Sequence, residues 1–473
     1  MPRMPRMARH TARRGIALAA ALAIPLALAP AAAAHDNGKG NGQGPDVRSG
    51  YYTQWSVYSG FTLKSVIDNG DASHLNEIDY AFINVAPETT GKLGGTDQYV
   101  PVADTPIECR SIDPWADYQM PFGGVGQPAS IDGSADDWSG LQGNFKQILE
   151  LKAKYPNIKV IASLGGFTLS DWFSDAALTE QTREHLVQSC VNMLINGNLP
   201  GLPEGAAKGV FDGIDVDWEY PGVPGDHATT LPPVAGPTAR PDDTKNFTAL
   251  LREFRSQLDQ AAATSPINGK KPHYLLTAAL SANPSTIAKL QVKDISRTLD
   301  QLDVMDYDFH GPWEATGPTD FQSELYPSPK ETPANQFSVD SSINTYLAAG
   351  ADRGKLIVGV PFYGHGWTGV QDGGTHGLYQ PATGPTAADG GTATWNVVSK
   401  LGYQPYRDPT TGGYWVYDPA STNLYVIDDP TEIVQKMQYV TQRGLGGAFY
   451  WSLDGDDSAG SLGAAVDLGL AGH

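Results

Sequence analysis

Short runs rich in β-branched and aromatic residues recur along the chain, and longer stretches with a helical spacing of apolar residues separate them. Eight of these runs are predicted to be strands: Ser49–Trp55, Ile78–Val85, Lys159–Leu164, Val210–Tyr220, Tyr274–Leu280, Val304–Phe309, Leu356–Tyr363 and Gly447–Leu453. The clearest helical stretches are Asn144–Lys154, Glu180–Asn196, Thr244–Ala263 and Pro430–Arg443. Because eight strands that alternate with helices can close into a barrel, the pattern predicts an α/β fold, a (β/α)8 TIM barrel.

Two intervals between the predicted strands are too long for a simple crossover. Residues 86–143 are loop-like. Residues 364–429, between the seventh and eighth strands, contain strand-like patches at Gly413–Tyr417 and Leu424–Ile427. We expect residues 364–429 to form a small α+β insertion subdomain on the barrel rim. The barrel itself would then comprise residues 49–363 and 430–473.

The start of the chain has the pattern of a secretory signal peptide. Five arginines precede an apolar run, Ile16–Leu28, which is too short to span a bilayer, and the small residues that follow predict a cut after Ala34. The adjacent arginines Arg13–Arg14 leave both the general and the twin-arginine export routes open. Residues 35–48 are rich in Gly and Asn and predict a flexible leader. We therefore expect a secreted, extracellular protein.

Charge and composition narrow the possible partners. The 473 residues include 52 acidic and 32 basic side chains, which gives a formal charge of −20. Such a surface repels phosphate backbones and anionic lipids, so we expect no nucleic acid and no membrane partner. Beyond the signal peptide there is no apolar run of about 20 residues that could span a bilayer. Nothing in the sequence calls for more than a monomer.

The chain has two cysteines, Cys109 and Cys190. Two are too few for a disulfide scaffold or a multi-cysteine zinc site. In an oxidising compartment they could pair, but their distance in space cannot be derived from the sequence. A disulfide and two buried free thiols therefore remain alternatives.

The most informative segment is the fourth predicted strand, which has one acidic and one apolar face. Alternation puts Asp215, Asp217 and Glu219 on one side of the strand. Ile214, Val216 and Trp218 lie on the other. An edge strand with a solvated acidic face would also fit, but the neighbouring segments are themselves predicted barrel strands. The acids then point into the barrel, about 6.6 to 7 Å apart along the strand, and resist joint ionisation. Glu219 falls at the C-terminal end, where barrel active sites assemble, and could be held protonated as a general acid.

The spacing Asp212-x-x-Asp215-x-Asp217-x-Glu219 resembles the signature of glycoside hydrolase family 18. Other landmarks resemble motifs of this family in the same order: Tyr51 on the first strand, Ser163-Leu164-Gly165-Gly166 on the third, Met305-Asp306-Tyr307-Asp308 on the sixth and Trp451 on the eighth. The resemblance covers residues 49–457 and is to secreted bacterial chitinases of the family.

The resemblance implies a role for each acid. Glu219 would protonate the leaving oxygen and then act as a base on water. Asp217 would accept a hydrogen bond from the substrate acetamide N–H and stabilise the oxazolinium that forms when the acetamide oxygen attacks the anomeric carbon. Asp215 would share a proton or charge with Asp217, supported by Tyr51 and Ser163.

The resemblance also implies the groups that bind the sugar. Tyr307 would donate to the acetamide oxygen, Asp308 and the motif residue Met305 would line the sugar site, and Trp451 would form an apolar floor, although Trp451 could instead fill the barrel. Trp313 follows the sixth strand at its mouth and is predicted to stack on substrate. Three further tryptophans could equally be packing anchors: Trp172, Trp367 and Trp395.

The implied function is retaining, substrate-assisted cleavage of β-1,4-linked N-acetylglucosamine polymers, an endo-chitinase activity that needs no cofactor or metal. An endo-β-N-acetylglucosaminidase on N-glycans would use the same acids. A non-catalytic chitin-binding lectin of the same fold would typically lack the terminal Glu, which is present here as Glu219. Departures from the family pattern at Phe167, His365 and Asp306 call subsite affinity into question, not catalysis.

Overall fold

A computed structural model describes residues 46–92, 99–101, 105–225, 239–264, 271–330, 336–387 and 390–471. The predicted signal peptide and residues 35–45 of the predicted leader lie outside the described residues.

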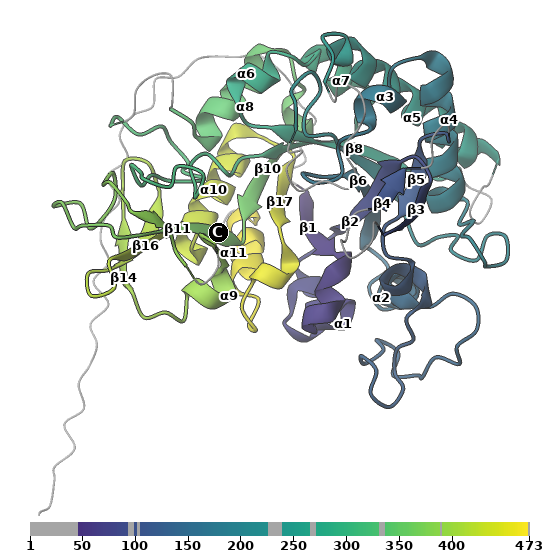
Figure 1. Ribbon diagram of the computed structural model, residues 1–473, viewed down its shortest axis with the longest axis horizontal. Helices are drawn as coiled ribbons and strands as arrows, with labels where there is room; N and C mark the ends of the chain where they lie inside the picture. Colours follow the sequence, from purple (N-terminus) through teal and green to yellow (C-terminus); the bar gives the residue numbers. More distant parts are fainter. Residues whose placement is uncertain are drawn as a thin grey trace, which may run out of the picture. The chain divides into compact units, whose positions relative to one another are not determined.

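Within the described residues, eight parallel strands form a closed barrel (Figure 1). In order around the barrel they are β1 (Val47–Thr53), β2 (Glu77–Ala86), β6 (Lys159–Gly165), β7 (Gly213–Asp217), β8 (Leu275–Ser281), β9 (Leu302–Met305), β10 (Leu356–Pro361) and β17 (Gly447–Trp451). Strand β1 pairs with both β17 and β2, and this double pairing closes the ring. The predicted (β/α)8 barrel is confirmed.

Several strand boundaries differ from the prediction, and those of β1, β9 and β7 differ most. Val47 and Arg48, expected in the leader, begin β1 because they pair with Gly447 and Ala448 of β17. Strand β9 starts at Leu302 and ends at Met305, before the predicted end at Phe309. Strand β7 is confined to Gly213–Asp217, the segment that pairs with β6 and β8, so that Glu219 lies just beyond the strand.

Helices surround the barrel on the outside (Figure 1). Their bounds are α1 (Leu63–Asp68), α2 (Gly143–Lys154), α3 (Phe173–Ala176), α4 (Glu180–Cys190), α5 (Asp243–Thr264), α6 (Pro284–Ile287), α7 (Val292–Thr298), α8 (Val339–Ala348), α9 (Trp395–Val398), α10 (Pro430–Arg443) and α11 (Ser461–Leu470). Short 3-10 or π turns are η1 (Gln54–Ser59), η2 (Asp71–Ser73), η3 (Trp115–Gln119), η4 (Val191–Ile195), η5 (Arg353–Lys355) and η6 (Leu453–Gly455). Helix α10 shows why its bounds were predictable. Asp429 caps its start by accepting from the Glu432 N–H at 2.9 Å, and Gly444, with φ of 64°, ends it.

An antiparallel sheet occupies most of the interval predicted to be an insertion. Its strands are β11 (Tyr363–Thr368), β12 (Gly384–Pro385), β13 (Thr392–Thr394), β14 (Gln404–Arg407), β15 (Tyr414–Asp418) and β16 (Asn423–Ile427). The sheet has its own apolar core, which includes the buried side chains of Trp367, Trp415 and Leu424. Its strand β11 begins two residues after the end of β10, and the sheet lies at one side of the barrel (Figure 1).

The interval 86–143 is less irregular than the sequence suggested. It contains β3 (Thr89–Lys92), β4 (Tyr99–Pro101) and β5 (Glu108–Ser111). Strand β5 pairs antiparallel with the end of β2. The structure also joins Cys109 of β5 to Cys190 at the end of α4 in a disulfide. No helix within the described ranges has the length and apolar character that a membrane span needs.

Candidate active site

The two faces of β7 separate the acids from the apolar residues. Ile214 and Val216 are fully buried on the outer side of the strand, among the residues of the main hydrophobic core. Just beyond the strand, the ring of Trp218 stacks on Phe173 with a centroid distance of 5.5 Å and meets the edge of Phe247 at 5.8 Å. This packing fixes the strand, so the alternate side chains point into the barrel.

Asp215 is held by hydroxyl groups from three other strands: the two neighbours of β7, which are β6 and β8, and β1, which is not paired with β7. Its Oδ2 accepts from Ser163 at 2.7 Å and from Tyr51 at 3.1 Å, and its Oδ1 accepts from Thr277 at 2.8 Å. Burial raises the pKa of Asp215, while the three hydroxyl donors act in the opposite direction by stabilising the carboxylate. The structure thus brings together Tyr51, Ser163 and Asp215, which the sequence predicted as a group. Thr277 was missed.

Asp217 and Glu219 complete the series toward the barrel mouth. Asp217 is buried, and its Oδ1 has no hydrogen-bond partner in the described residues. Burial, followed by the charges of Glu219 and Asp215, raises the pKa of Asp217 well above its usual value. Burial also raises the pKa of Glu219 to about 7. A hydrogen bond with Tyr220 lowers it, and the charge of Asp308 adds to the rise. A carboxyl with a pKa near 7 can serve as both acid and base near neutral pH.

The backbone of Glu219 is anchored by Ser170, a residue that no sequence pattern indicated. The Glu219 N–H donates to Ser170 Oγ at 2.9 Å. Ser170 in turn donates to the carbonyls of Gly166 at 2.9 Å and Asp217 at 3.1 Å. The loop after β6 therefore fixes the position of the topmost acid.

The end of β9 brings Tyr307 next to these acids. The pKa of Tyr307 is raised well above its usual value, first by burial and then by the charges of Asp217 and Asp308. Asp308, with φ of 60°, turns away from the strand. Its Oδ1 accepts from Tyr363 at 2.7 Å and lies 2.8 Å from His365 Nε2. Tyr363 and His365 were not predicted as partners of Asp308.

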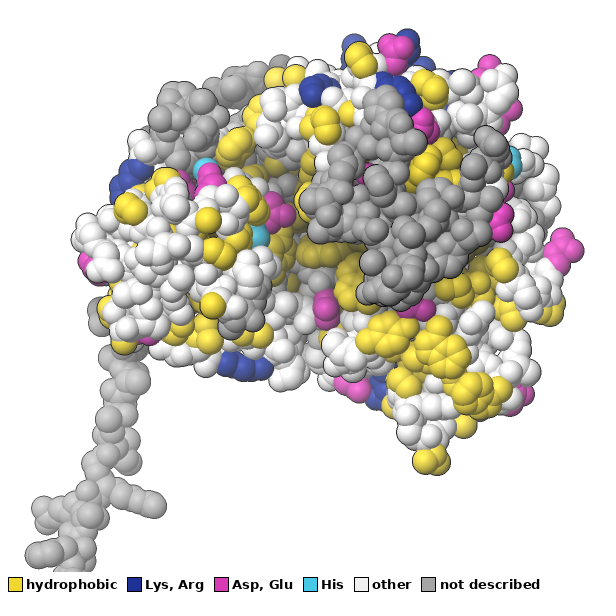
Figure 2. Space-filling model, viewed as in Figure 1, with side chains coloured by type: hydrophobic (Ala, Val, Ile, Leu, Met, Phe, Trp, Pro, Cys, Tyr) yellow, Lys and Arg dark blue, Asp and Glu magenta, His cyan; other side chains and the backbone are white. Residues whose placement is uncertain are grey.

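Aromatic rings form a cluster around Tyr51, the residue that donates to Asp215. Trp451 is partly buried and lies 5.2 Å from the Tyr51 ring and 5.5 Å from the Phe82 ring, onto which it stacks. Met305 packs into the same cluster. Trp313 is 60% exposed and meets His365 edge-on at 5.2 Å. Figure 2 shows a hollow near the middle of the face in view, with hydrophobic side chains at its base and acidic and histidine side chains at its side.

Further carboxyl groups inside the barrel were not predicted. Asp79 lies beside Tyr51 in the β1–β2 register, and Asp303 lies beside Ala279 in the β8–β9 register. Both are buried, and burial together with the charge of Asp215 raises the pKa of each well above its usual value. Asp303 is the one acid of β9, whereas β2 carries both Glu77 and Asp79, and no longer series of acids marks either strand. Asp212, the first acid of the motif, instead pairs with Lys152 at 2.6 Å outside this series.

The remaining tryptophans considered as groove residues differ in exposure. Trp367 is fully buried in the antiparallel sheet, and the Trp395 indole donates to Asp457 at 3.2 Å. Trp172 is partly buried before α3. Trp367 and Trp395 are therefore packing residues, and Trp313 is the exposed one of these four tryptophans.

Of the positions that depart from the family pattern, Phe167 is exposed and Asp306 is buried against the Ser342 hydroxyl.

A separate polar cavity of about 900 Å³ contains none of the predicted sugar-binding or catalytic residues. Its lining includes Cys109, Tyr118, His185, Asn192 and Gln257. It therefore lies apart from the acid series. In the described part of the chain, no group of three or more His, Cys, Asp or Glu side chains is arranged to hold a metal ion.

The closed barrel, with an inward acid series ending at its C-terminal mouth, defines a site for acid–base chemistry on a bound substrate. Residues 47–456 match the model of glycosyl hydrolases family 18. The chain belongs to this family, as the motif predicted.

Named relatives support the same assignment. The chain is 32% identical over 437 residues to Chitinase A1 of Niallia circulans, covering 86% of this chain and 56% of the relative. It is 33% identical over 429 residues to Chitinase C of Streptomyces lividans, covering 88% and 58%. It therefore spans less than two thirds of these relatives. The catalytic domain of chitinase B from Arthrobacter TAD20 superposes with a TM-score of 0.78 at 34% identity, covering 90% of this chain and 95% of that one.

Proposed function

We propose that the protein is a secreted, monomeric chitinase that hydrolyses β-1,4 linkages of N-acetylglucosamine polymers with retention of configuration. The observation that carries the proposal is the series from buried Asp215 through Asp217 to Glu219, whose pKa is about 7. A protonated carboxyl above a buried acid pair provides the proton that a glycosidic leaving group requires. The names of the relatives indicate chitin as the substrate.

The reaction follows from these positions. Glu219 gives its proton to the glycosidic oxygen while the substrate's acetamide oxygen bonds to the anomeric carbon, so that an oxazolinium replaces the leaving group. Asp217 accepts from the acetamide N–H, and Tyr307 donates to the acetamide oxygen. Glu219, now a carboxylate, takes a proton from water as the water opens the oxazolinium. Two displacements at the same carbon retain its configuration.

Exposed aromatic side chains support a long, linear substrate. Trp55, Tyr58, Trp115 and Trp138 are all exposed, and the Trp115 and Trp138 rings lie 6.4 Å apart. Sugar rings bind to such faces by stacking. Hydrophobic side chains also gather near α2 in the space-filling view (Figure 2).

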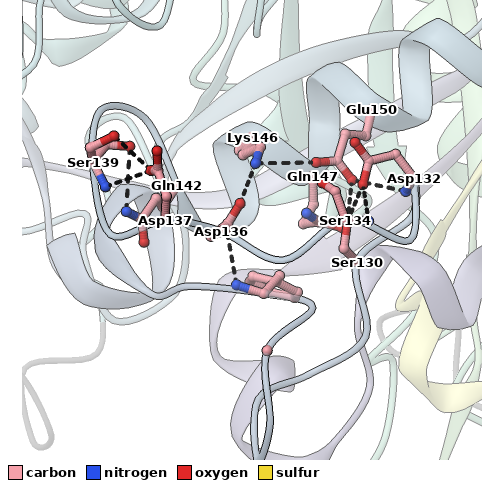
Figure 3. Close-up of polar contacts among 12 residues, drawn as sticks. Ser130, Asp132, Ser134, Asp136, Asp137, Ser139, Gln142, Lys146, Gln147 and Glu150 are labelled. Atoms are coloured by element: carbon pink, nitrogen blue, oxygen red, sulfur yellow. Dashed lines mark hydrogen bonds and ion pairs between the residues drawn. The ribbon is translucent and has the colours of Figure 1, made fainter.

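The loop that carries Trp138 is fastened to α2 (Figure 3). Lys146 pairs with Asp136, and the Gln147 side chain accepts from the Ile131 N–H at 2.9 Å. Glu150 accepts from the Ser130 hydroxyl, also at 2.9 Å. These bonds attach the loop to α2 on the amino-terminal side of Trp138, whose side chain is exposed on the loop.

Export is supported by the amino-terminal pattern and by the disulfide, which persists in oxidising compartments. The test of function incubates the protein with a chitin hexamer and, separately, with an N-glycoprotein. Shorter chito-oligomers, released first as the β-anomer in NMR spectra, are expected. Released N-glycans with intact hexamer would indicate the glycosidase alternative, and binding without any cleavage would indicate a lectin.

A further inference from the structure

The turn that carries Tyr307 is bonded at both ends to one short buried segment further along the chain. On the amino-terminal side, the Ser323 hydroxyl donates to the Asp306 carbonyl at 2.6 Å. On the carboxyl-terminal side, the Phe309 N–H donates to the Gln322 carbonyl at 3.1 Å. Gln322 and Ser323 are both buried. The two ends of the turn are therefore fixed, while Tyr307 lies half-buried between them.

The hydroxyl of Ser323 has a defined orientation, because its second neighbour is the ammonium group of Lys436. Lys436 lies on α10, is fully buried and donates to Ser323 Oγ at 2.8 Å. The carboxyl of Asp428 contacts this ammonium group, and that of Glu432 lies 3.4 Å from it. An ammonium group can only donate and a carbonyl can only accept, so the single hydroxyl hydrogen of Ser323 points to Asp306.

The bond to the Asp306 carbonyl acts directly on the backbone of Tyr307. This carbonyl and the nitrogen of Tyr307 belong to one planar peptide unit, so a bond that fixes the carbonyl also fixes the start of Tyr307. The next residue, Asp308, has φ of 60°, a conformation that is uncommon for residues other than glycine and persists where the surroundings impose it. The Tyr307 ring meets the rings of Tyr363 and Phe449 edge-on, at 6.1 and 6.2 Å. The fixed backbone and these ring contacts together determine where the Tyr307 hydroxyl lies.

We propose that Ser323 is a positioning residue: its hydroxyl, aligned by the buried cation of Lys436, fixes the peptide before Tyr307 and so places the Tyr307 hydroxyl against the acetamide oxygen of the substrate. The proposal rests on the proposed role of Tyr307 as the donor to that oxygen. Ser323 and Lys436 are too deeply buried to touch the substrate themselves. Helix α10, on the outside of the barrel, thereby contributes to the geometry of the site.

The test is a double-mutant cycle on kcat/KM for a chitin oligomer, built from Ser323→Ala and Tyr307→Phe. Ser323→Ala is expected to lower kcat/KM about tenfold in the wild-type background, because a small misplacement of a positioned group costs much of its effect on the rate. In the Tyr307→Phe background the hydroxyl is already absent, so the same change should cost less than about twofold. An equal loss in both backgrounds would show a defect unrelated to the Tyr307 hydroxyl and would overturn the proposal.

Ser296→Ala is the matched control, because Ser296 is a buried serine on α7 whose hydroxyl accepts from the Asp352 N–H at 2.8 Å, ahead of β10. We expect this variant to keep the wild-type kcat/KM.

A second variant reaches Ser323 from its other neighbour. Lys436→Met alone would leave the buried carboxyl of Asp428 without its cation, so it is combined with Asp428→Asn and compared with Asp428→Asn by itself. Loss of the cation is expected to lower kcat/KM about threefold, again only where Tyr307 has its hydroxyl. An unchanged kcat/KM on loss of Lys436, or on loss of the Ser323 hydroxyl, would overturn the proposal.

Fluorine NMR decides the question without turnover. In protein labelled with 3-fluorotyrosine, the signal of Tyr307 is assigned with Tyr307→Phe, and that of Tyr155, at the end of α2, with Tyr155→Phe. In Ser323→Ala the Tyr307 signal is expected to shift or broaden while the Tyr155 signal stays in place. An unmoved Tyr307 signal would overturn the proposal. A moved signal in a protein whose wild type does not cleave chitin would contradict the proposed function and leave the positioning of Tyr307 supported.

Discussion

Ser163 and Asp215 face each other across the β6–β7 pairing, and the Ser163 hydroxyl donates to Asp215 Oδ2 at 2.7 Å. Both side chains are fully buried. Asp215 therefore owes its stabilisation to hydroxyl dipoles from three strands, with Tyr51 and Thr277 as the other donors. This arrangement makes the charge of Asp215 sensitive to each donor.

Ser163→Ala should lower kcat/KM by about tenfold or more, because losing a hydrogen bond to a charged group costs about 1.5 to 3 kcal/mol. The pKa of Asp215 should rise in the variant, since a donor that lowers it is gone. Steady-state kinetics on a chitin oligomer measures the effect. Ser73→Ala is the control, because Ser73 donates to the Gly70 carbonyl at an exposed turn. Equal kcat/KM values in the two variants would contradict a role for Asp215 in catalysis.

The pH dependence of wild-type activity should have its alkaline limb near pH 7. The acid Glu219 acts only when protonated, and its pKa is about 7. Above that pH, kcat/KM should fall tenfold per unit as the carboxylate replaces the acid. A limb near the ordinary glutamate value would show that the site does not raise the pKa of Glu219.

The free energy of unfolding should depend on pH because of the buried acids Asp79 and Asp303. The pKa values of Asp79 and Asp303 are raised on folding, so the folded state binds more protons than the unfolded state once pH exceeds their unfolded value of about 3.9. The stabilisation that these two groups contribute to the free energy of unfolding is complete below that pH. It is lost as pH rises toward their pKa values in the folded state, by up to about 1.4 kcal/mol per pH unit for each group.

Asp79→Asn and Asp303→Asn should therefore be more stable than wild type at pH 7, with a gain that shrinks as pH falls to 4. Urea unfolding at several pH values measures this difference. Asp68→Asn is the control, because Asp68 is an exposed partner of Lys64. Destabilisation of the two interior variants at pH 7, with no dependence on pH, would contradict the assigned direction.

Trp138→Ala should slow the hydrolysis of polymeric chitin several-fold and leave short oligomers nearly unaffected. Trp138 is 66% exposed and belongs to the loop bound to α2, which carries none of the acids, so we expect only a long chain to reach it. Loss of one stacking contact costs about 0.5 to 1.5 kcal/mol. Rates on insoluble polymer and on tetramer give the comparison, with Tyr326→Ala, at another exposed aromatic, as the control. An equal decrease on both substrates would place Trp138 at the cleavage site itself.

The sequence predicted the barrel and the acid series because both depend on local patterns. Strand alternation placed Asp215 and Asp217 together, and the position of Glu219 at the end of the run predicted its place at the mouth. The strand boundaries were predicted less well than the strands themselves, as β9 shows. A strand ends where its neighbour stops pairing with it, and local sequence does not determine that point.

The contacts that position the side chains of the site could not be predicted from local sequence patterns. Thr277 reaches Asp215 across a separation of 62 residues, and His365 reaches Asp308 across 57. Such pairs are set by barrel register and by the docking of the antiparallel sheet. A lone serine such as Ser170, or a lone acid such as Asp303 in β9, carries no periodic signal by which it could be selected.

The central claim is that Glu219 supplies the proton to the glycosidic oxygen. The most direct test compares Glu219→Gln with wild type in two assays on the same chitin hexamer, cleavage by product sizing and binding by calorimetry. The account predicts that kcat falls by about 100- to 10,000-fold while the hexamer still binds. Cleavage at the wild-type rate by folded Glu219→Gln would contradict it.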